Sequence, residues 1–380
     1  MPLFLLTVLS IYTAVHVYAF LKARSAFNFG FISGVALGLF MTIMVFSSLL
    51  VRVLEKHGLD PAAQMVSCVG YSWMGFLFLF FTVSLLTDFT RAIIYFIGAY
   101  TRTDISRLMP NAKTAFIFPF LLALVLGIYG YFEALNIRPH FVTISSSKLP
   151  PSSGRIRLVQ ISDVHLGLMV RQERLNRIIT VIREQNPDIL VSTGDFVDGQ
   201  LDSISDLADS LQAIRPRYGK YTVTGNHEFH AGLQHSREIT ERAGFKMLRG
   251  ESVFPAEGIS ITGVDDRALV RHGIKPSVEE SSLLQSLDST RFRILLKHQP
   301  EIRQSSLGLF DLQLSGHTHG GQIFPFRIMV RLFYPYVSGL HDLGKGSSLF
   351  VNRGTGTWGP VMRFLTPPEV TVIDLVPSGK

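Results

Sequence analysis

Four long runs of uncharged, mostly apolar residues dominate the N-terminal part of this 380-residue chain. Each is long enough to cross about 30 Å of hydrocarbon as a helix, which takes about 20 residues. A helix also satisfies its backbone hydrogen bonds without water. Residues 1–137 hold only 13 of the 65 charged side chains. The sequence therefore predicts an all-α transmembrane domain at residues 1–137, with spans at about 2–21, 29–51, 64–87 and 114–134.

Residues 138–380 have the composition of an ordinary soluble domain. They carry the other 52 charged residues, about 21% of the segment against about 9% before it. The net charge is +7, but the Lys and Arg residues form no continuous block in the sequence, so we expect no nucleic-acid partner. The single cysteine, Cys68, excludes an internal disulfide framework and a cysteine-rich zinc site.

Within this second part, apolar segments typical of strands end in polar residues five times. Strands are expected at residues 157–162, 188–192, 220–223, 293–296 and 312–314, and apolar residues at helical spacing follow the first of them. Ligand sites gather at the carboxyl ends of strands in α/β sheets. The polar residues that follow these strands are Asp163, His165, Asp195, Asn226, His227, His298, His317 and His319.

Seven of these side chains form a mixed nitrogen and oxygen donor set. Imidazole and carboxylate groups suit first-row divalent metals such as Mn, Fe or Zn. Seven ligands are too many for one tetrahedral ion but fit two ions that share a ligand, the arrangement used for in-line displacement at phosphorus. The sequence thus predicts two divalent metal ions held by Asp163, His165, Asp195, Asn226, His298, His317 and His319.

The motifs DVH, TGD, GNHE, KH and GHTHGGQ, in this order, resemble the signature of the calcineurin-like metallophosphoesterase superfamily. The resemblance covers about residues 138–376, and the C-terminal segment VNRGTGTWGPVMRFLTPPEVTVIDL is similar to that of a membrane-associated bacterial subfamily. That subfamily includes phosphodiesterases and a pyrophosphatase acting on UDP-2,3-diacylglucosamine. The resemblance implies a four-layer α/β fold for residues 138–380, with two β-sheets flanked by helices.

The resemblance also implies a role for each site residue. The first metal would be held by Asp163, His165, Asp195 and His319, and the second by Asp195, Asn226, His298 and His317. Asp195 would bridge the ions, and a hydroxide shared by them would attack phosphorus in line. His227 would be catalytic, facing the phosphate oxygens or the leaving group. Glu228, where many members have Asp, is not expected to bind metal.

The substrate is predicted from the segment 322–337, where aromatic residues alternate with arginines. It is either a loop and short helix packed on the core, or a membrane-facing lip that admits an acyl chain. The second interpretation favours a phosphodiester or pyrophosphate on a lipid, with membrane lipids as partners and no inferable protein partner. The arginines that could meet phosphate are Arg327, Arg331, Arg353 and Arg363. A phosphoprotein phosphatase and a catalytically silent membrane sensor that binds phosphate ligands stay open as alternatives.

Loop charges indicate the orientation. Six Lys/Arg residues follow the first and third spans and two follow the second, which places the domain 138–380 on the extracytoplasmic side of a bacterial inner or plasma membrane. A UDP-linked lipid is made in the cytoplasm, so this orientation and that substrate disagree. Either the charge count misleads or the substrate is a different lipid phosphate. The counted residues are Lys22, Arg24, Arg91, Arg102, Arg107 and Lys113, against Arg52 and Lys56.

Overall fold

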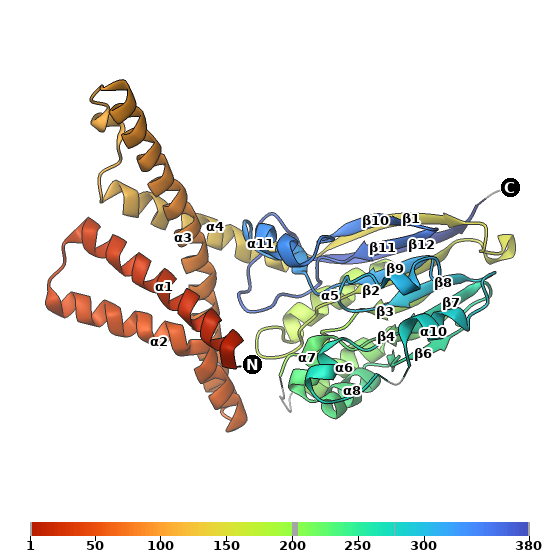
Figure 1. Cartoon of the computed structure of the whole chain (residues 1–380). Coiled ribbons are helices and arrows are strands. Elements are labelled where there is room, and N and C mark those ends of the chain that lie inside the picture. Colours follow the sequence, from red (N-terminus) through yellow and green to blue (C-terminus); the bar gives the residue numbers. More distant parts are fainter. Residues whose placement is uncertain (1, 200–203, 277, 379–380) are drawn as a thin grey trace. The chain divides into compact units, whose positions relative to one another are not determined.

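The computed structural model describes residues 2–199, 204–276 and 278–378 and divides the chain into two compact units (Figure 1). The first runs to Phe132 and includes Pro360–Met362, and the second comprises Glu133–Gly359 and the segment from Arg363 onward. The boundary after Phe132 lies inside a helix, whereas the sequence predicts it after residue 137.

Four helices long and apolar enough to cross a membrane make up the N-terminal region. They are α1 (Pro2–Phe27), α2 (Phe31–Lys56), α3 (Asp60–Thr101) and α4 (Thr114–Leu135). The third helix is far longer than the predicted span at 64–87, because the apolar segment AIIYFIGAYT continues it without a break. The predicted fold class, four long apolar helices followed by an α/β domain, is confirmed.

Partly buried polar contacts join α1 to α3 inside this unit. The carboxylate of Asp88 accepts hydrogen bonds from the Tyr18 hydroxyl (2.6 Å) and from the Lys22 ammonium (2.7 Å). The Trp73 indole N–H donates to Nε2 of His16 over 2.9 Å. Side chains that hydrogen-bond across helices hold a bundle together where apolar contacts alone give little preference over lipid.

The second unit contains two six-stranded mixed β-sheets. The first has the strand order β1-β12-β2-β3-β4-β5 and the second β10-β11-β9-β8-β7-β6. Strands β2, β3 and β4 run parallel in the first sheet, as do β7, β8, β9 and β11 in the second. The strands are β1 (Arg138–Ser146), β2 (Ile156–Ile161), β3 (Ile189–Ser192), β4 (Lys220–Thr222), β5 (Lys246–Met247), β6 (Glu251–Val253), β7 (Ile259–Gly263), β8 (Phe292–Leu296), β9 (Leu312–Ser315), β10 (Gly339–Gly344), β11 (Ser347–Val351) and β12 (Glu369–Pro377).

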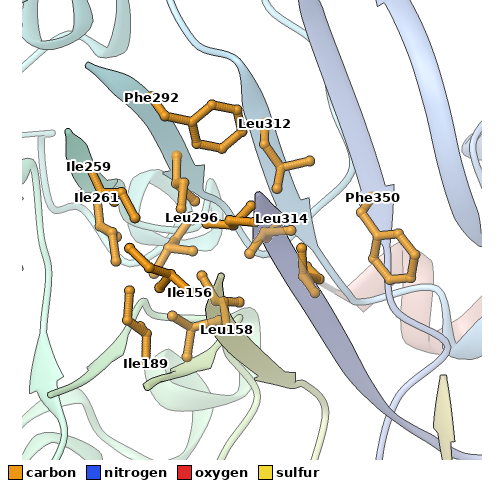
Figure 2. Packing of buried hydrophobic residues seen from close by; sticks show 14 of the residues in the cluster. Ile156, Leu158, Ile189, Ile259, Ile261, Phe292, Leu296, Leu312, Leu314 and Phe350 are labelled. Atoms are coloured by element: carbon orange, nitrogen blue, oxygen red, sulfur yellow. The ribbon is translucent and has the colours of Figure 1, made fainter. Parts of the chain in front are cut away.

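A continuous apolar core lies between the two sheets (Figure 2). Leu158 and Ile189 contribute to it from the first sheet, and Ile261, Leu296 and Leu314 from the second. All five are fully buried. Burial of a large aliphatic side chain stabilises a fold by about 1.5–3 kcal/mol. This layer of side chains therefore holds the two sheets together.

Helices cover the outer faces of both sheets. On α5 (Gln172–Glu184), Leu175, Ile178 and Ile182 are buried at helical spacing, as the sequence predicts. Leu284 of α10 (Glu280–Gln285) packs with Leu295 of the second sheet. The other helices are α6 (Ile204–Gln212), α7 (Asn226–Ala231), α8 (Leu233–Arg242), α9 (Ala268–Arg271) and α11 (Phe326–Phe333), with short 3-10 turns at η1 (Ser106–Leu108), η2 (Pro151–Ser153), η3 (Gln304–Ser306) and η4 (His319–Gly321).

Candidate metal centre

Five segments, each following the carboxyl end of a parallel strand, carry the predicted metal ligands and His227, with Asn226 and His227 at the start of α7. Those segments follow β2, β3 and β4 in one sheet and β8 and β9 in the other. The backbone there is unusual, because several residues other than glycine adopt positive φ, a region that costs a side-chain-bearing residue energy. They are Asp163 (φ 52°), His165 (53°), Asp195 (50°), His317 (70°) and His319 (49°).

Two glycines let these loops approach one another. A methyl group on Gly225 would overlap the carboxylate of Asp195, and one on Gly316 would overlap Ser162 and Asp163. Only glycine leaves room for the backbone at such points. The motifs TGD, GNHE and GHTH therefore specify close contact between loops as well as donor atoms.

One cluster of donors joins Asp163, His165 and His319. The Nε2 atoms of His165 and His319 face each other at 3.2 Å, and Nε2 of His319 lies 3.4 Å from Oδ1 of Asp163. The Ser162 hydroxyl donates to Oδ2 of Asp163 over 2.5 Å, and the backbone N–H of His317 donates to the same carboxylate. These contacts hold the Asp163 side chain toward the two rings.

A second cluster joins Asp195, His298 and His317. The Nε2 atom of His298 lies 3.1 Å from Oδ2 of Asp195 and 3.0 Å from Nδ1 of His317. Asn226 belongs to the same predicted ligand set, and its Oδ1 atom is buried with no hydrogen-bond partner among the residues that the structure describes. A buried orphan acceptor is costly unless a donor or a cation satisfies it.

Asp195 connects the two clusters. A third donor group consists of His165, Asp195 and His227, so the Asp195 carboxylate lies within reach of a histidine from the first cluster as well as of His298. Its Oδ1 atom accepts the backbone N–H of His227 over 2.8 Å. This intermediate position is the one that a bridging carboxylate requires.

Electrostatics favour the metal-binding form of three of these donors, His165, His317 and Asp195. Burial lowers the pKa of His165 to about 4, and burial together with the charge of His298 lowers that of His317 to about 3, so both rings are neutral. Burial opposes ionisation of Asp195, but the charges of His298 and His227 outweigh it and hold the pKa of that carboxyl well below its usual range. Neutral imidazole and ionised carboxylate are the forms that bind metal.

The residues present fit divalent metal ions. The donors are imidazole nitrogens, carboxylates and one amide oxygen, a set that suits first-row metals. Ring nitrogens that point at one another at 3.0 and 3.2 Å, beside buried carboxylates, are arranged as ligands are around a cation. All seven predicted metal ligands lie in this one region of the fold.

His227 has a partner that the sequence analysis missed. Its Nδ1 atom lies 2.9 Å from Oδ1 of Asp198, three residues beyond Asp195. Burial lowers the pKa of His227, but the charges of Asp195 and Asp198 and the hydrogen bond to Asp198 outweigh it and raise the pKa to about 9. In the sequence, the only sign of this partner is the second aspartate in GDFVD, Asp198. The motif does not show that its side chain points toward His227.

Glu228 holds the loop of Asp195 in place through hydrogen bonds to the backbone. Its carboxylate accepts the backbone N–H groups of Asp195 (3.0 Å), Phe196 (2.7 Å) and Gly225 (2.6 Å). Glu228 is almost fully buried and lies in no donor cluster. It therefore ties two ligand-bearing loops together.

The four arginines predicted to meet phosphate have different environments. Arg363 is fully buried, and its guanidinium donates to the carbonyl groups of His319 (2.8 Å), Arg353 (2.7 Å), Gly354 (3.2 Å) and Gly356 (2.6 Å), so its predicted contact with substrate is wrong. Arg353 donates to Glu369 over 2.6 Å. Arg327 donates to the Ser338 hydroxyl over 3.0 Å, and Arg331 is exposed.

Most apolar residues of helix α11 are exposed and none is buried, so the interpretation of the segment as packed on the core does not hold for this helix. Met329 is 50% exposed, Leu332 73% and Phe333 76%. The more covered residues of the helix, Arg327 and Val330, occupy the opposite face. The helix thus turns its apolar face outward, the reverse of an ordinary surface helix.

Comparison with known proteins gives consistent relatives. The calcineurin-like phosphoesterase family model matches residues 156–321. An uncharacterized metallophosphoesterase of Aquifex aeolicus is 38% identical over 259 residues, which cover 68% of this chain and 99% of that protein. One from Campylobacter jejuni is 30% identical over 299 residues, 78% of each chain. A Danio rerio "transmembrane protein with metallophosphoesterase domain" is 35% identical over 269 residues, 67% of this chain and 61% of that protein.

Two mixed sheets with histidines and aspartates clustered at their carboxyl ends, in a chain with these relatives, define a metal-dependent phosphoester hydrolase. The chain belongs to the calcineurin-like metallophosphoesterase family. The predicted superfamily and enzyme class are thereby confirmed. The family uses divalent metals, and the four apolar helices mark the chain as a membrane protein.

Proposed function

We propose that this chain is a membrane-anchored phosphoesterase that uses two divalent ions to hydrolyse a phosphodiester or pyrophosphate bond in a lipid-linked substrate. The observation that carries the proposal is the position of Asp195 between the two donor clusters. A carboxylate within reach of both sets allows two ions to share it, and a pair of cations is suited to in-line displacement at phosphorus.

The proposed chemistry divides between the ions and the chain. Two divalent ions would supply a water of lowered pKa as nucleophile and neutralise charge on the phosphoryl oxygens. The carboxylates of Asp163 and Asp195 and the predicted histidine ligands would hold the ions, and Asn226 would complete the second set with its orphan oxygen. His227, held by Asp198, presents Nε2 toward the substrate as a proton donor to the leaving oxygen.

Two features support a lipid-linked substrate. The four long apolar helices would keep the catalytic domain at a bilayer, where lipid substrates are locally concentrated. The outward apolar face of α11 begins five residues after Gly321 of the last metal motif, and exposed Arg331 lies on the same helix. An exposed apolar patch beside basic residues is suited to acyl chains and anionic head groups.

Hydrolysis assays on the full chain in detergent test the reaction type. We expect metal-dependent hydrolysis of bis-p-nitrophenyl phosphate that exceeds hydrolysis of p-nitrophenyl phosphate. Preference for the monoester together with activity on phosphopeptides would favour a phosphoprotein phosphatase instead. Absence of turnover on all these substrates in metal-loaded protein would favour a sensor.

A matched pair of surface variants tests the lipid-linked substrate. Phe333→Ser changes a residue of α11, and Phe254→Ser changes the residue that follows β6 in the second sheet. Each variant removes one exposed aromatic ring, which is 76% exposed in Phe333 and 58% exposed in Phe254. We expect Phe333→Ser to lower the ratio of lipid phosphodiester to soluble diester hydrolysis several-fold, and Phe254→Ser to leave that ratio unchanged. Equal ratios in both variants would contradict the lipid preference.

For the side of the membrane, the loop charges favour an extracytoplasmic catalytic domain. A reporter fused after Lys380 that is active only outside the cytoplasm tests this orientation. Signal from a cytoplasm-specific reporter at the same point would reverse it.

A further inference from the structure

Tyr334, the residue that follows α11, places its hydroxyl against a predicted metal ligand. The hydroxyl oxygen lies 2.9 Å from Nε2 of His317 and 2.8 Å from Oε1 of Gln299. The Arg267 guanidinium donates to the same oxygen over 3.2 Å. Tyr334 itself is half-buried, so these contacts are partly shielded from water.

The direction of each hydrogen bond follows from Asp266, at the far end of the chain of contacts. Asp266 is 3% exposed, and both of its oxygens lie within 3.0 Å of Nε2 of Gln299. An ionised carboxylate only accepts, so the Gln299 amide directs its NH₂ group at Asp266 and its oxygen at Tyr334. The single hydroxyl hydrogen of Tyr334 is therefore donated to Gln299.

That assignment decides the tautomer of His317. With its hydrogen committed, the Tyr334 oxygen can only accept, and Nε2 of His317 must carry the proton that it receives. Nδ1 of His317 then bears a lone pair. This Nδ1 atom is the one that lies 3.0 Å from Nε2 of His298 in the second donor cluster.

His298 is fixed in a complementary way. Its Nδ1 atom lies 2.7 Å from the carbonyl oxygen of Thr193, which can only accept, so Nδ1 carries a proton and Nε2 is the ring atom left to bind a metal. In the neutral form of His298 that binds metal, its Nε2 atom and Nδ1 of His317 would both offer lone pairs beside the Asp195 carboxylate. A cation held there would take the place of the proton on His298.

We propose that Asp266, Gln299 and Tyr334 form a directed hydrogen-bond chain that holds His317 as the Nε2–H tautomer and so makes Nδ1 its metal-binding atom. Tyr334 is thus a positioning residue for the second ion. The inference rests on the proposed two-metal function. Partners that orient a metal-bound histidine typically contribute about 10–100-fold in metal affinity or activity.

The experiment is a Mn²⁺ titration of the full chain in detergent, with free Mn²⁺ measured by electron paramagnetic resonance. Wild type is expected to bind two ions and to show the spectrum of a coupled Mn²⁺ pair. Tyr334→Phe is expected to weaken the second ion about 10–100-fold, to leave the first unchanged and to lose the coupled spectrum at limiting Mn²⁺.

Two further variants separate positioning from general damage. Tyr336→Phe is the matched control, because the Tyr336 ring packs on His341, with centroids 4.9 Å apart, instead of on a predicted ligand. Gln299→Met breaks the chain at another link and is expected to reproduce the selective loss of the second ion. The outcome of each is independent of the other.

The failures are distinguishable. A wild-type protein that binds fewer than two ions would overturn the proposed function. A wild-type protein that binds two ions, with Tyr334→Phe and Gln299→Met binding both as tightly as Tyr336→Phe does, would overturn the tautomer chain alone. Equal loss of both ions in Tyr334→Phe would likewise count against it, since the chain acts on His317 only.

Discussion

The Nδ1 atom of His227 lies 2.9 Å from Oδ1 of Asp198, while the backbone N–H of His227 donates to Oδ1 of Asp195 over 2.8 Å. The residue is therefore held at two points, by its ring and by its main chain. The Asp198 bond occupies Nδ1 and leaves Nε2 as the free ring atom. In its proposed role as proton donor, a ring held in this way needs no reorganisation when a phosphate arrives.

Replacement of His227 by alanine should remove turnover without removing metal. None of the four predicted ligands of either ion is lost, and general acid catalysis typically contributes about 10²–10⁴-fold. We expect kcat on a phosphodiester to fall within that range while the metal content stays at the wild-type level. Metal analysis and kinetics on the same preparation check this, and full activity in metal-replete protein would remove the role of His227.

Asp198→Asn should lower activity less than His227→Ala does. The amide keeps the size of the side chain but removes the charge that orients and stabilises the protonated ring. We expect about a 10-fold loss in kcat with KM nearly unchanged, because the ring is held less well and substrate contacts remain. A rise in KM at constant kcat would instead mean that Asp198 binds substrate.

Gly316→Ala should disrupt the first donor cluster. A methyl group at this position would overlap the Ser162 hydroxyl and the Asp163 carboxylate, which are hydrogen-bonded to each other. We expect the affinity for the first metal to fall by at least about 10-fold, measured by titration. Gly30→Ala is the control, since a methyl group on Gly30 meets nothing within 4 Å. Wild-type affinity in Gly316→Ala would show that the loop can relax.

The ion pair between Asp374 and Arg157 should make a pH-dependent contribution to the stability of the second unit. The Arg157 guanidinium donates to both Asp374 oxygens, at 2.8 and 2.9 Å, across the β2–β12 pair. The hydrogen bonds to Arg157 hold the pKa of Asp374 below its ordinary value. The folded pKa lies below the unfolded one, so the stabilisation is present above the unfolded pKa of about 3.9 and is lost as pH falls through the folded pKa.

Asp374→Asn measures this increment. We expect a lower thermal unfolding midpoint at pH 7, equivalent to about 1 kcal/mol, and no difference from wild type once Asp374 is protonated in both states. Thermal unfolding in detergent at a series of pH values provides the comparison. A difference that stays constant down to pH 3 would mean that shape rather than charge stabilises the pair.

The donor residues could be found from the sequence because each follows a short apolar strand. The strand predicted at 188–192 is β3 at Ile189–Ser192, and Asp195 lies in the loop after it. Parallel strands bring their carboxyl ends to one edge, so strand order alone gathers the ligands. The positive φ of Asp195 could not be foreseen, since it depends on the neighbouring loop that Gly225 lets approach.

The burial of polar side chains could not be predicted from the sequence, although helical spacing did predict the buried apolar residues of α5. An arginine near the C-terminus is as compatible with phosphate binding as with a buried set of carbonyl contacts, and only the fold shows that Arg363 makes the latter. Asp198 and Tyr334 gain their roles from loops that meet in space. The apolar segment 92–101 is too short to cross a membrane by itself, so the sequence predicts that it either extends the third span or lies at the interface, and the structure shows that it extends α3.

Metal stoichiometry of the full chain, by equilibrium dialysis against Mn²⁺ with elemental analysis, is the most direct test of a shared Asp195. We expect two tightly bound ions per chain in wild type and at most one in Asp195→Ala, because the Asp195 carboxylate is the ligand that the two predicted metal sites share. Saturation of wild type at a single ion, or two tight ions in Asp195→Ala, would contradict the two-metal centre.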